Sequence, residues 1–331
     1  MTLTLIATII IVLALLFDFL NGFHDAANAI ATIVVTRTLT PFQAVLMAGV
    51  ANFAGFLVFG VAIANTIGKG IVDPQYVTLS LISSSLIGAI LWNILTWYLG
   101  LPTSSSHALM GGLVGSALAA VGMKAVMLAG VIRIFLFIFI APFLGMLGAI
   151  VFTMGVFLLC RKANRRTVNP VFKRLQLISA ALYSLGHGTN DAQKTMGIIA
   201  LVLLSSGINE QFHVDLWVVL ACQASIAMGT MFGGWRIVKT MGTSIIKIRP
   251  MEGFCVESSS ALVLLSTAHM GIPVSTTHVI AGSIMGAGTV ENARSVHWVV
   301  ARKIVWAWIL TIPMTALISA LCYGVISLFR F

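Results

Sequence analysis

A short polar signature occurs twice in this chain, each time inside sequence that is otherwise apolar. Gly22–Ala26 returns as Gly188–Ala192, 166 residues later, and both copies place an aspartate directly before an alanine. A second motif returns in the same way, because Pro102–His107 matches Pro273–His278, 171 residues later. A repeat on this scale predicts one fold that is built from two related halves.

Composition predicts that these halves lie in a lipid bilayer. Of the 331 residues, 59% are hydrophobic and 8% are charged, and the mean hydropathy is +1.04, whereas a soluble domain carries about 25% charged residues. Several apolar stretches can cross about 30 Å of hydrocarbon as helices: 3–20, 42–67, 78–99, 134–160 and 216–235. The first lacks a basic flank and a small-residue cleavage site, so we expect a retained helix. An all-α integral membrane protein is predicted.

The net charge of +10 indicates orientation here rather than a nucleic-acid partner. Basic residues gather in the connections 161–174 and 236–249, whereas 209–215 carries acids. Basic connections stay in the cytoplasm, so we predict two inverted halves, 1–160 and 175–331, joined by the cytoplasmic connection 161–174. Both termini would then lie outside a multi-pass protein of the cell inner (plasma) membrane.

Three aspartates interrupt the apolar segments: Asp18, Asp25 and Asp191. A charge at the bilayer centre costs at least ~2.5 kcal/mol, so such a residue is by default part of a functional site. Gly, Asn and His around Asp25 and Asp191 disfavour a continuous helix, and we therefore interpret both signatures as broken helices. Interruptions at corresponding positions of two halves are typical of a transporter's central site. Helix N-termini there favour anions, and carboxylates favour cations.

The second repeated motif supplies small hydroxyl groups from two directions: Ser104, Ser105, Ser106, Ser275, Thr276 and Thr277. Convergent neutral donors with little bulk suit a tetrahedral oxyanion. Pro102 and Pro273 suit the first turn of a helix. Glycines follow each motif, at 111–115 and 282–288, and would let short half-helices pack closely. Two re-entrant helical hairpins are predicted.

Other chemistry is less well supported by the sequence. Ser106 and His107 with an aspartate are the residue types of a hydrolase, but adjacent helical residues point about 100° apart and the chain carries two such sets. No phosphate loop of an ATP-driven pump is present, and the four cysteines have no metal-like spacing. We predict no enzyme, no cofactor, and no metal beyond a possible sodium ion.

The residues around both signatures resemble one known family. Phe17–Ala29 is similar to the first signature of the inorganic phosphate transporter (PiT) family, and Gly186–Lys194 resembles the second signature in its bacterial form. The Pro-x-Ser/Thr runs also match, so the resemblance covers essentially the whole chain. It implies cation-coupled symport of inorganic phosphate, inverted repeats, and a central site formed by the signatures and hairpins.

The resemblance also implies which residues bind the anion and the coupling ion. The substrate would be bound by Asp25, Ser104, Ser105, Ser106, Asp191, Lys194, Ser275, Thr276 and Thr277. The coupling ion would be bound by Asp25, Asn28, Asn190 and Asp191. Relatives further imply a homodimer and a soluble PhoU-like accessory protein as a partner.

One position departs from the family pattern. Sodium-coupled relatives carry Asn in both signatures, whereas here Asn28 is matched by Lys194. Two aspartates with a doubly charged phosphate require positive charge in a low-dielectric site. We hypothesise that Lys194 supplies part of it, so that the chain needs fewer sodium ions or couples to protons.

The identity of the anion and the transport mode have alternatives. Phosphate carries a proton that it can donate to a carboxylate, whereas sulfate only accepts, which favours phosphate. A symporter of sulfate or another tetrahedral oxyanion is the alternative, and a passive anion channel is a further one. The coupling ion is either a proton or sodium.

Overall fold

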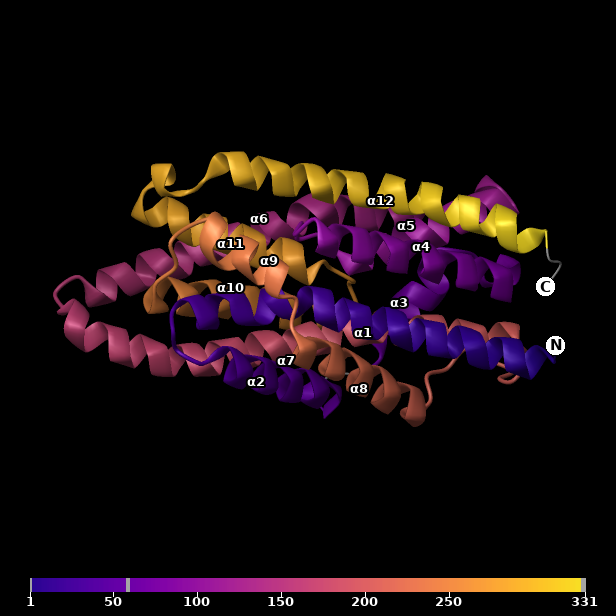
Figure 1. Ribbon diagram of the computed structural model, residues 1–331, viewed down its shortest axis with the longest axis horizontal. Coiled ribbons are helices and arrows are strands. Elements are labelled where there is room, and N and C mark those ends of the chain that lie inside the picture. Colours follow the sequence, from indigo (N-terminus) through magenta and orange to yellow (C-terminus); the bar gives the residue numbers. More distant parts are fainter. Residues whose placement is uncertain (1, 58–59, 329–331) are drawn as a thin grey trace.

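The structure is a computed structural model that describes residues 2–57 and 60–328. Within these ranges helices are the only regular elements, and the one pairing of extended residues is an isolated bridge between Val72 and Val126. The helices run mostly along the long axis of the molecule (Figure 1). The prediction of an all-α protein is confirmed.

The order of helices repeats along the chain. The first series is α1 (Leu3–Val35), α2 (Pro41–Ala54), α3 (Ala62–Gly70), α4 (Leu79–Tyr98), α5 (Ser105–Ala120) and α6 (Leu128–Cys160). The second is α7 (Arg165–Ser205), α8 (Leu216–Phe232), α9 (Trp235–Lys239), α10 (Pro250–His269), α11 (Thr276–Glu291) and α12 (Trp298–Ser327). Each last helix contains an internal proline, Pro142 or Pro313. α7 begins at Arg165, so most of 161–174 is helical; the division into two repeats stays a prediction.

The expected helix breaks at the two signatures are wrong. α1 is continuous through Gly22 and Asp25, and α7 is continuous through Gly188 and Asp191. The glycines serve close helix contact instead: a Cβ on Gly22 would meet the backbone of Ile226 in α8. The polar side chains bond to neighbouring helices, so the backbone has no need to open.

The chain bends elsewhere, at corresponding places in the two series. Pro41–Leu57 and Ala62–Gly70 meet at 81°, and Leu216–Phe232 meets Trp235–Ser244 at 62°. The second segment of the latter pair includes the π-helical turn η4 (Thr240–Ser244). Broken helices are therefore present, but they lie beside the signature helices and not within them.

Serine hydroxyls set where the two short helices begin. The Ser104 hydroxyl accepts from the His107 amide at 3.2 Å, and the Ser275 hydroxyl accepts from the His278 amide at 3.2 Å. Serine is among the strongest N-cap residues, so α5 and α11 start just after these caps. The sequence suggested that Pro102 and Pro273 lie in the first turns of these helices. Both prolines instead lie before the helices begin.

The two series are interleaved. α5 packs along α12 and α11 packs along α6, while α1 contacts α8 and α7 contacts α2. The glycines that follow the Ser/Thr motifs make these contacts possible, because a Cβ on Gly115 would meet the backbone of Ala316, and one on Gly286 would meet that of Met146. The glycine-rich segments thus join helices of the first series to helices of the second.

Length and composition allow α1, α4, α6 and α12 to cross a membrane, or up to six spans if each bent pair counts as one. α5 and α11 have 16 residues each, or about 24 Å, which is short for a complete crossing. That they form re-entrant hairpins stays a prediction. The finding supports a multi-pass membrane protein.

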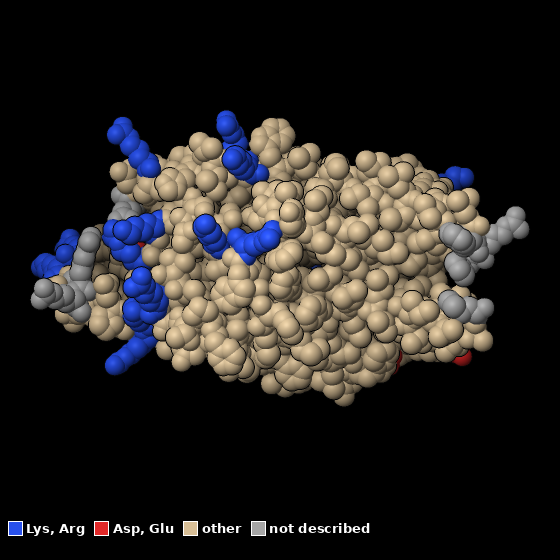
Figure 2. All heavy atoms as spheres, viewed as in Figure 1, with Lys and Arg blue, Asp and Glu red and all other residues tan. Residues whose placement is uncertain are grey.

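Charge is concentrated at one end of the molecule. α1 begins and α12 ends at the same end, and the connection between α6 and α7 lies at the opposite end (Figure 1). Figure 2 shows Lys and Arg atoms over the half of this face that lies toward that opposite end, while most of the other half is free of charge. Such a wide apolar surface is what a bilayer requires.

Candidate functional site

Asp25 lies in the middle of α1 and is buried. Its Oδ1 lies 2.9 Å from His24 Nδ1, and its Oδ2 lies 3.2 Å from the hydroxyl oxygens of both Thr276 and Thr277 at the start of α11. Asn28, one turn later on α1, donates from Nδ2 to Thr277 Oγ1 at 2.9 Å. The first signature therefore meets the second Ser/Thr motif.

Asp191 lies in α7 and is also fully buried. Lys194, one turn later, forms an ion pair with Asp191 Oδ1 and donates to the Ser106 hydroxyl and to the Val274 carbonyl. The Asp191 Oδ2 accepts from the Thr276 hydroxyl at 3.1 Å. The second signature therefore contacts both Ser/Thr motifs.

The two aspartates come together, as the repeat predicts. Asp25, Asp191 and His187 each offer a ligand atom, and these atoms lie within 4.8 Å of one another. His187 Nε2 is 3.3 Å from Asp191 Oδ2, and its Nδ1 is 3.2 Å from Asn52 Oδ1. Carboxylates this close repel each other unless a cation or a proton lies between them. This geometry can hold a small hard cation.

Lys194 belongs to this site and does not reach toward the membrane surface. Its side chain is 1% exposed, and its three bonding partners lie on α7, α5 and the segment before α11. A fixed ammonium in such a place offsets one of the two negative charges. The pair of aspartates with Lys194 is then left with one net negative charge when the histidines are neutral.

The six hydroxyl residues of the Ser/Thr motifs divide by role. Ser106, Thr276 and Thr277 contact the aspartates or Lys194. Ser104 and Ser275 accept helix N-terminal amides, so their oxygens are occupied by capping. The Ser105 hydroxyl is buried without a hydrogen-bond partner in the described part of the chain.

Asn190, which the sequence suggested as an ion ligand, uses its amide nitrogen elsewhere, whereas its Oδ1 is buried without a partner among the described residues, so this role stays a prediction. Its Nδ2 donates to the Leu264 carbonyl of α10 at 2.9 Å and to the Gly186 carbonyl at 3.1 Å. A residue next to Asp191 on a helix points about 100° away from it. Asn190 therefore ties α7 to α10.

Comparison with known proteins shows which family the chain belongs to. The phosphate transporter family matches residues 21–319 of the chain. The chain belongs to this family. Its members are transporters and not enzymes.

Relatives cover the whole chain. A protein of Rhizobium meliloti (strain 1021), named "Probable low-affinity inorganic phosphate transporter", is 52% identical over 95% of this chain and 94% of its own length. A protein of the same name from Bacillus subtilis (strain 168) is 41% identical over 99% of each chain. A solved structure, "The sodium-dependent phosphate transporter", superposes with a TM-score of 0.87 at 28% identity, covering 98% of this chain and 99% of that one.

The structure also contains a second buried polar cluster, around a glutamate of α10, that the sequence analysis did not single out. Glu257 of α10 accepts hydrogen bonds from Thr32 at 2.6 Å, Gln176 at 2.9 Å and Ser179 at 2.5 Å. These donors lie on α1 and α7, so the carboxylate links three helices. The sequence could have indicated this residue, because an acid inside an apolar segment is by default part of a functional or structural site.

Thr103 and Thr96 also extend the site beyond the predicted residues. The Thr103 hydroxyl donates to Thr96 Oγ1 at 2.9 Å, and His24 Nε2 lies 3.3 Å from the same oxygen. These contacts connect Asp25, through His24, to the end of α4. His24 and Thr96 are 72 positions apart, so no local pattern identifies the connection between them.

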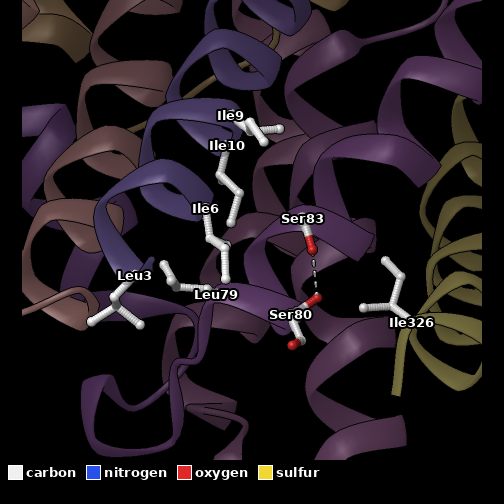
Figure 3. Close-up of a pocket in the computed structure, with 8 residues that line it drawn as sticks. All are labelled: Leu3, Ile6, Ile9, Ile10, Leu79, Ser80, Ser83 and Ile326. Carbon is white, nitrogen blue, oxygen red and sulfur yellow. Dashed lines mark hydrogen bonds between the residues drawn. The ribbon is translucent and has the colours of Figure 1, made fainter. Parts of the chain in front are cut away.

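An apolar pocket lies away from these groups. Its cavity has a volume of about 240 Å³. Figure 3 shows aliphatic side chains of α1, α4 and α12 around Ser80 and Ser83. The Ser83 hydroxyl donates to the Ser80 carbonyl at 3.0 Å, so its hydrogen is already used. A charged anion would lose its hydration there without gaining donors, and the pocket is not a phosphate site.

Proposed function

We propose that this chain is a secondary active symporter that moves inorganic phosphate into the cell with a cation, either a proton or sodium. The observation that carries this proposal is the meeting of Asp25 and Asp191 around the shared hydroxyl group of Thr276. Two carboxylates in an apolar interior require a cation, and a transported anion increases that requirement.

The supply of hydrogens at the site supports a bound cation. The Thr276 hydroxyl lies within hydrogen-bond distance of Asp25 Oδ2 and of Asp191 Oδ2, but it has one hydrogen to donate. Thr277 Oγ1 is likewise 3.2 Å from both Asp25 Oδ2 and the Thr103 carbonyl. The one Thr276 hydrogen cannot serve both Oδ2 atoms at once, and a cation or an added proton between the two carboxylates would supply the difference.

The anion is bound by the groups that face this cation. α5 and α11 both begin at the aspartates, and helix N-termini offer amide hydrogens and positive potential to an anion. Ser106, Thr276 and Thr277 contribute hydroxyls that now contact the carboxylates, and Lys194 contributes its ammonium. When a cation neutralises the aspartates, these donors become free for phosphate.

The relatives support phosphate as the substrate, because both curated proteins are named inorganic phosphate transporters. The solved structure named as sodium-dependent supports cation coupling. We further propose that the two series of helices are inverted and that both termini lie outside an inner-membrane protein. The basic end in Figure 2 supports this orientation.

Uptake of labelled phosphate into proteoliposomes tests the function under separately imposed sodium, proton and electrical gradients. Accumulation against a phosphate gradient is expected with one of the two cation gradients. Asp25→Asn and Asp191→Asn should each lower uptake at least tenfold, whereas Asp73→Asn, an acid of the short connection before α4, should not. Flux that never exceeds equilibration would indicate a channel and reject symport.

Competition decides the anion. A tenfold excess of unlabelled sulfate should leave phosphate uptake nearly unchanged, and unlabelled phosphate should suppress it. Strong inhibition by sulfate would favour a general oxyanion symporter.

A further inference from the structure

A third acid of the interior, Asp18, has no place in the site described above. It lies seven residues before Asp25 on α1, about 10 Å along the helix axis. Its side chain is fully buried, and its Oδ1 accepts from the Thr195 hydroxyl at 2.9 Å. Its Oδ2 has no hydrogen-bond partner among the described residues. The same holds for Asn21 Oδ1, one turn later on α1.

These orphaned oxygens indicate a missing positive charge. A buried acceptor that lacks a donor loses the free energy of its hydration without compensation, and an ionised buried carboxylate loses more. Residues three apart on a helix are neighbours, so Asp18 and Asn21 lie on one side of α1. A proton on the Asp18 carboxyl removes the charge and supplies a donor.

The charged groups near Asp18 do not supply this positive charge. The titratable groups near it are Asp191 and Lys194 of α7 and the neutral thiol of Cys222 of α8. The Lys194 ammonium is already bonded to Asp191, Ser106 and the Val274 carbonyl. α2 and α4, which also pack against α1, contain no acidic or basic residue and no His or Cys.

Asp18 and Lys194 are matched departures from the repeat. The 166-residue step that relates Asp25 to Asp191 relates Asp18 to Ser184, whose hydroxyl donates to the Ala180 carbonyl. The same step relates Asn28 to Lys194. One half thus has an additional acid, the other has an additional base, and Thr195 next to Lys194 bonds to that acid.

We propose that Asp18 is the proton-carrying residue of the symport cycle. The inference rests on the proposed symport. Lys194 replaces one transported cation with a fixed charge, and the cation that travels with phosphate is a proton bound to the Asp18 carboxylate. The carboxylate gains the proton on the outer side, where α1 begins, and releases it on the inner side after phosphate leaves.

Two transport modes of purified protein in proteoliposomes separate this role from phosphate binding. Accumulation driven by a pH gradient needs net proton movement, whereas exchange of internal for external phosphate at equal pH does not. Asp18→Asn should retain exchange within about twofold of wild type and lose accumulation. For one proton, a gradient of about one pH unit supports about tenfold accumulation, so the ratio should fall from about ten to about one.

Two further variants complete the test. Asp18→Glu keeps a carboxyl group and should retain both modes, and Glu210→Gln, which removes an exposed acid between α7 and α8, should do the same. If Asp18→Asn does not elute as a monodisperse protein, Thr195→Val replaces it, because it removes only the hydroxyl that bonds Asp18. Thr195→Val should then lower pH-driven accumulation and spare exchange.

Several results would overturn the proposal. Asp18→Asn that accumulates phosphate like wild type would show that another group carries the proton. Loss of exchange together with accumulation in a monodisperse variant would place Asp18 in phosphate binding. Accumulation by wild type that follows only a sodium gradient, and fails in Asp18→Asn, would make the site one for sodium. If none of the imposed gradients makes the wild-type protein accumulate phosphate, the proposed symport itself fails.

Discussion

Lys194 decides the charge of the central site. It is buried, and it bonds the aspartate of its own helix and groups from both Ser/Thr motifs. Removing one partner of a buried ion pair costs about 3–5 kcal/mol. The effect of losing this ammonium should therefore be large, and it should depend on which other cations are present.

We expect Lys194→Asn to make transport depend on sodium. Without the ammonium, Asp25 and Asp191 need a bound ion, so uptake at low sodium should fall at least tenfold and recover as sodium rises. Initial rates measured against sodium concentration at constant ionic strength test this. Lys162→Asn, at an exposed position beyond α6, is the control and should follow wild type. An unchanged sodium dependence in Lys194→Asn would contradict the expectation.

At this scale the sequence predicted the paired aspartates but not all of their neighbours. The repeat was enough to bring Asp25 and Asp191 together. The Asn190 amide nitrogen bonds to α10, which the sequence did not indicate, and its part in ion binding stays a prediction. Ser104 and Ser275 are caps, which a local N-cap pattern could have indicated. The Asn28–Thr277 hydrogen bond joins residues 249 positions apart, and no local pattern reveals it.

Helix contacts depend on glycine at the places where the two series meet. A Cβ at Gly286 would meet the Met146 backbone, and overpacking of this kind costs about 1–3 kcal/mol. Gly286→Ala should therefore lower the unfolding temperature in detergent by several degrees. Gly155→Ala lies in α6, where an added Cβ meets nothing within 4 Å, and should match or exceed wild type. Equal unfolding temperatures for the two variants would argue against this contact.

Glu257 joins three helices by hydrogen bonds alone. Glu257→Ala leaves the donors of Thr32, Gln176 and Ser179 without their acceptor, and each unsatisfied buried group costs about 1–3 kcal/mol. Its unfolding temperature should drop clearly, with Glu257→Gln in between because it keeps one acceptor oxygen. Glu210→Ala, an exposed change, should melt with wild type. A Glu257→Ala variant as stable as wild type would show that the network adds little.

The sequence predicted breaks in the two signature helices, but α1 and α7 are continuous. Gly, Asn and His lower helix propensity by up to about 1 kcal/mol each, which tertiary contacts readily override. In these helices the polar groups bond to partners on α11, α5 and α10. Propensity describes a helix alone, whereas these helices are held by their neighbours.

The orientation of the whole molecule can be tested by labelling. The connection between α7 and α8 lies at the end where α1 begins, opposite the connection between α6 and α7 (Figure 1). In a variant without native cysteines, Glu210→Cys should react with an impermeant maleimide on intact cells. Lys162→Cys should react only after permeabilisation. The reverse pattern would place the basic end outside and refute the predicted orientation.

The exchange of helices between the two series also affects how the protein is made. α5 emerges from the ribosome long before α12, the helix that covers its glycines, and α6 waits in the same way for α11. Until the last helix is inserted, close-packing faces of the early helices meet lipid or each other. The binding site needs Thr276 and Thr277 of α11 and is therefore completed only after most of the helices are made, and a chain that stops after α6 would lack the α11 and α12 contacts of its helices.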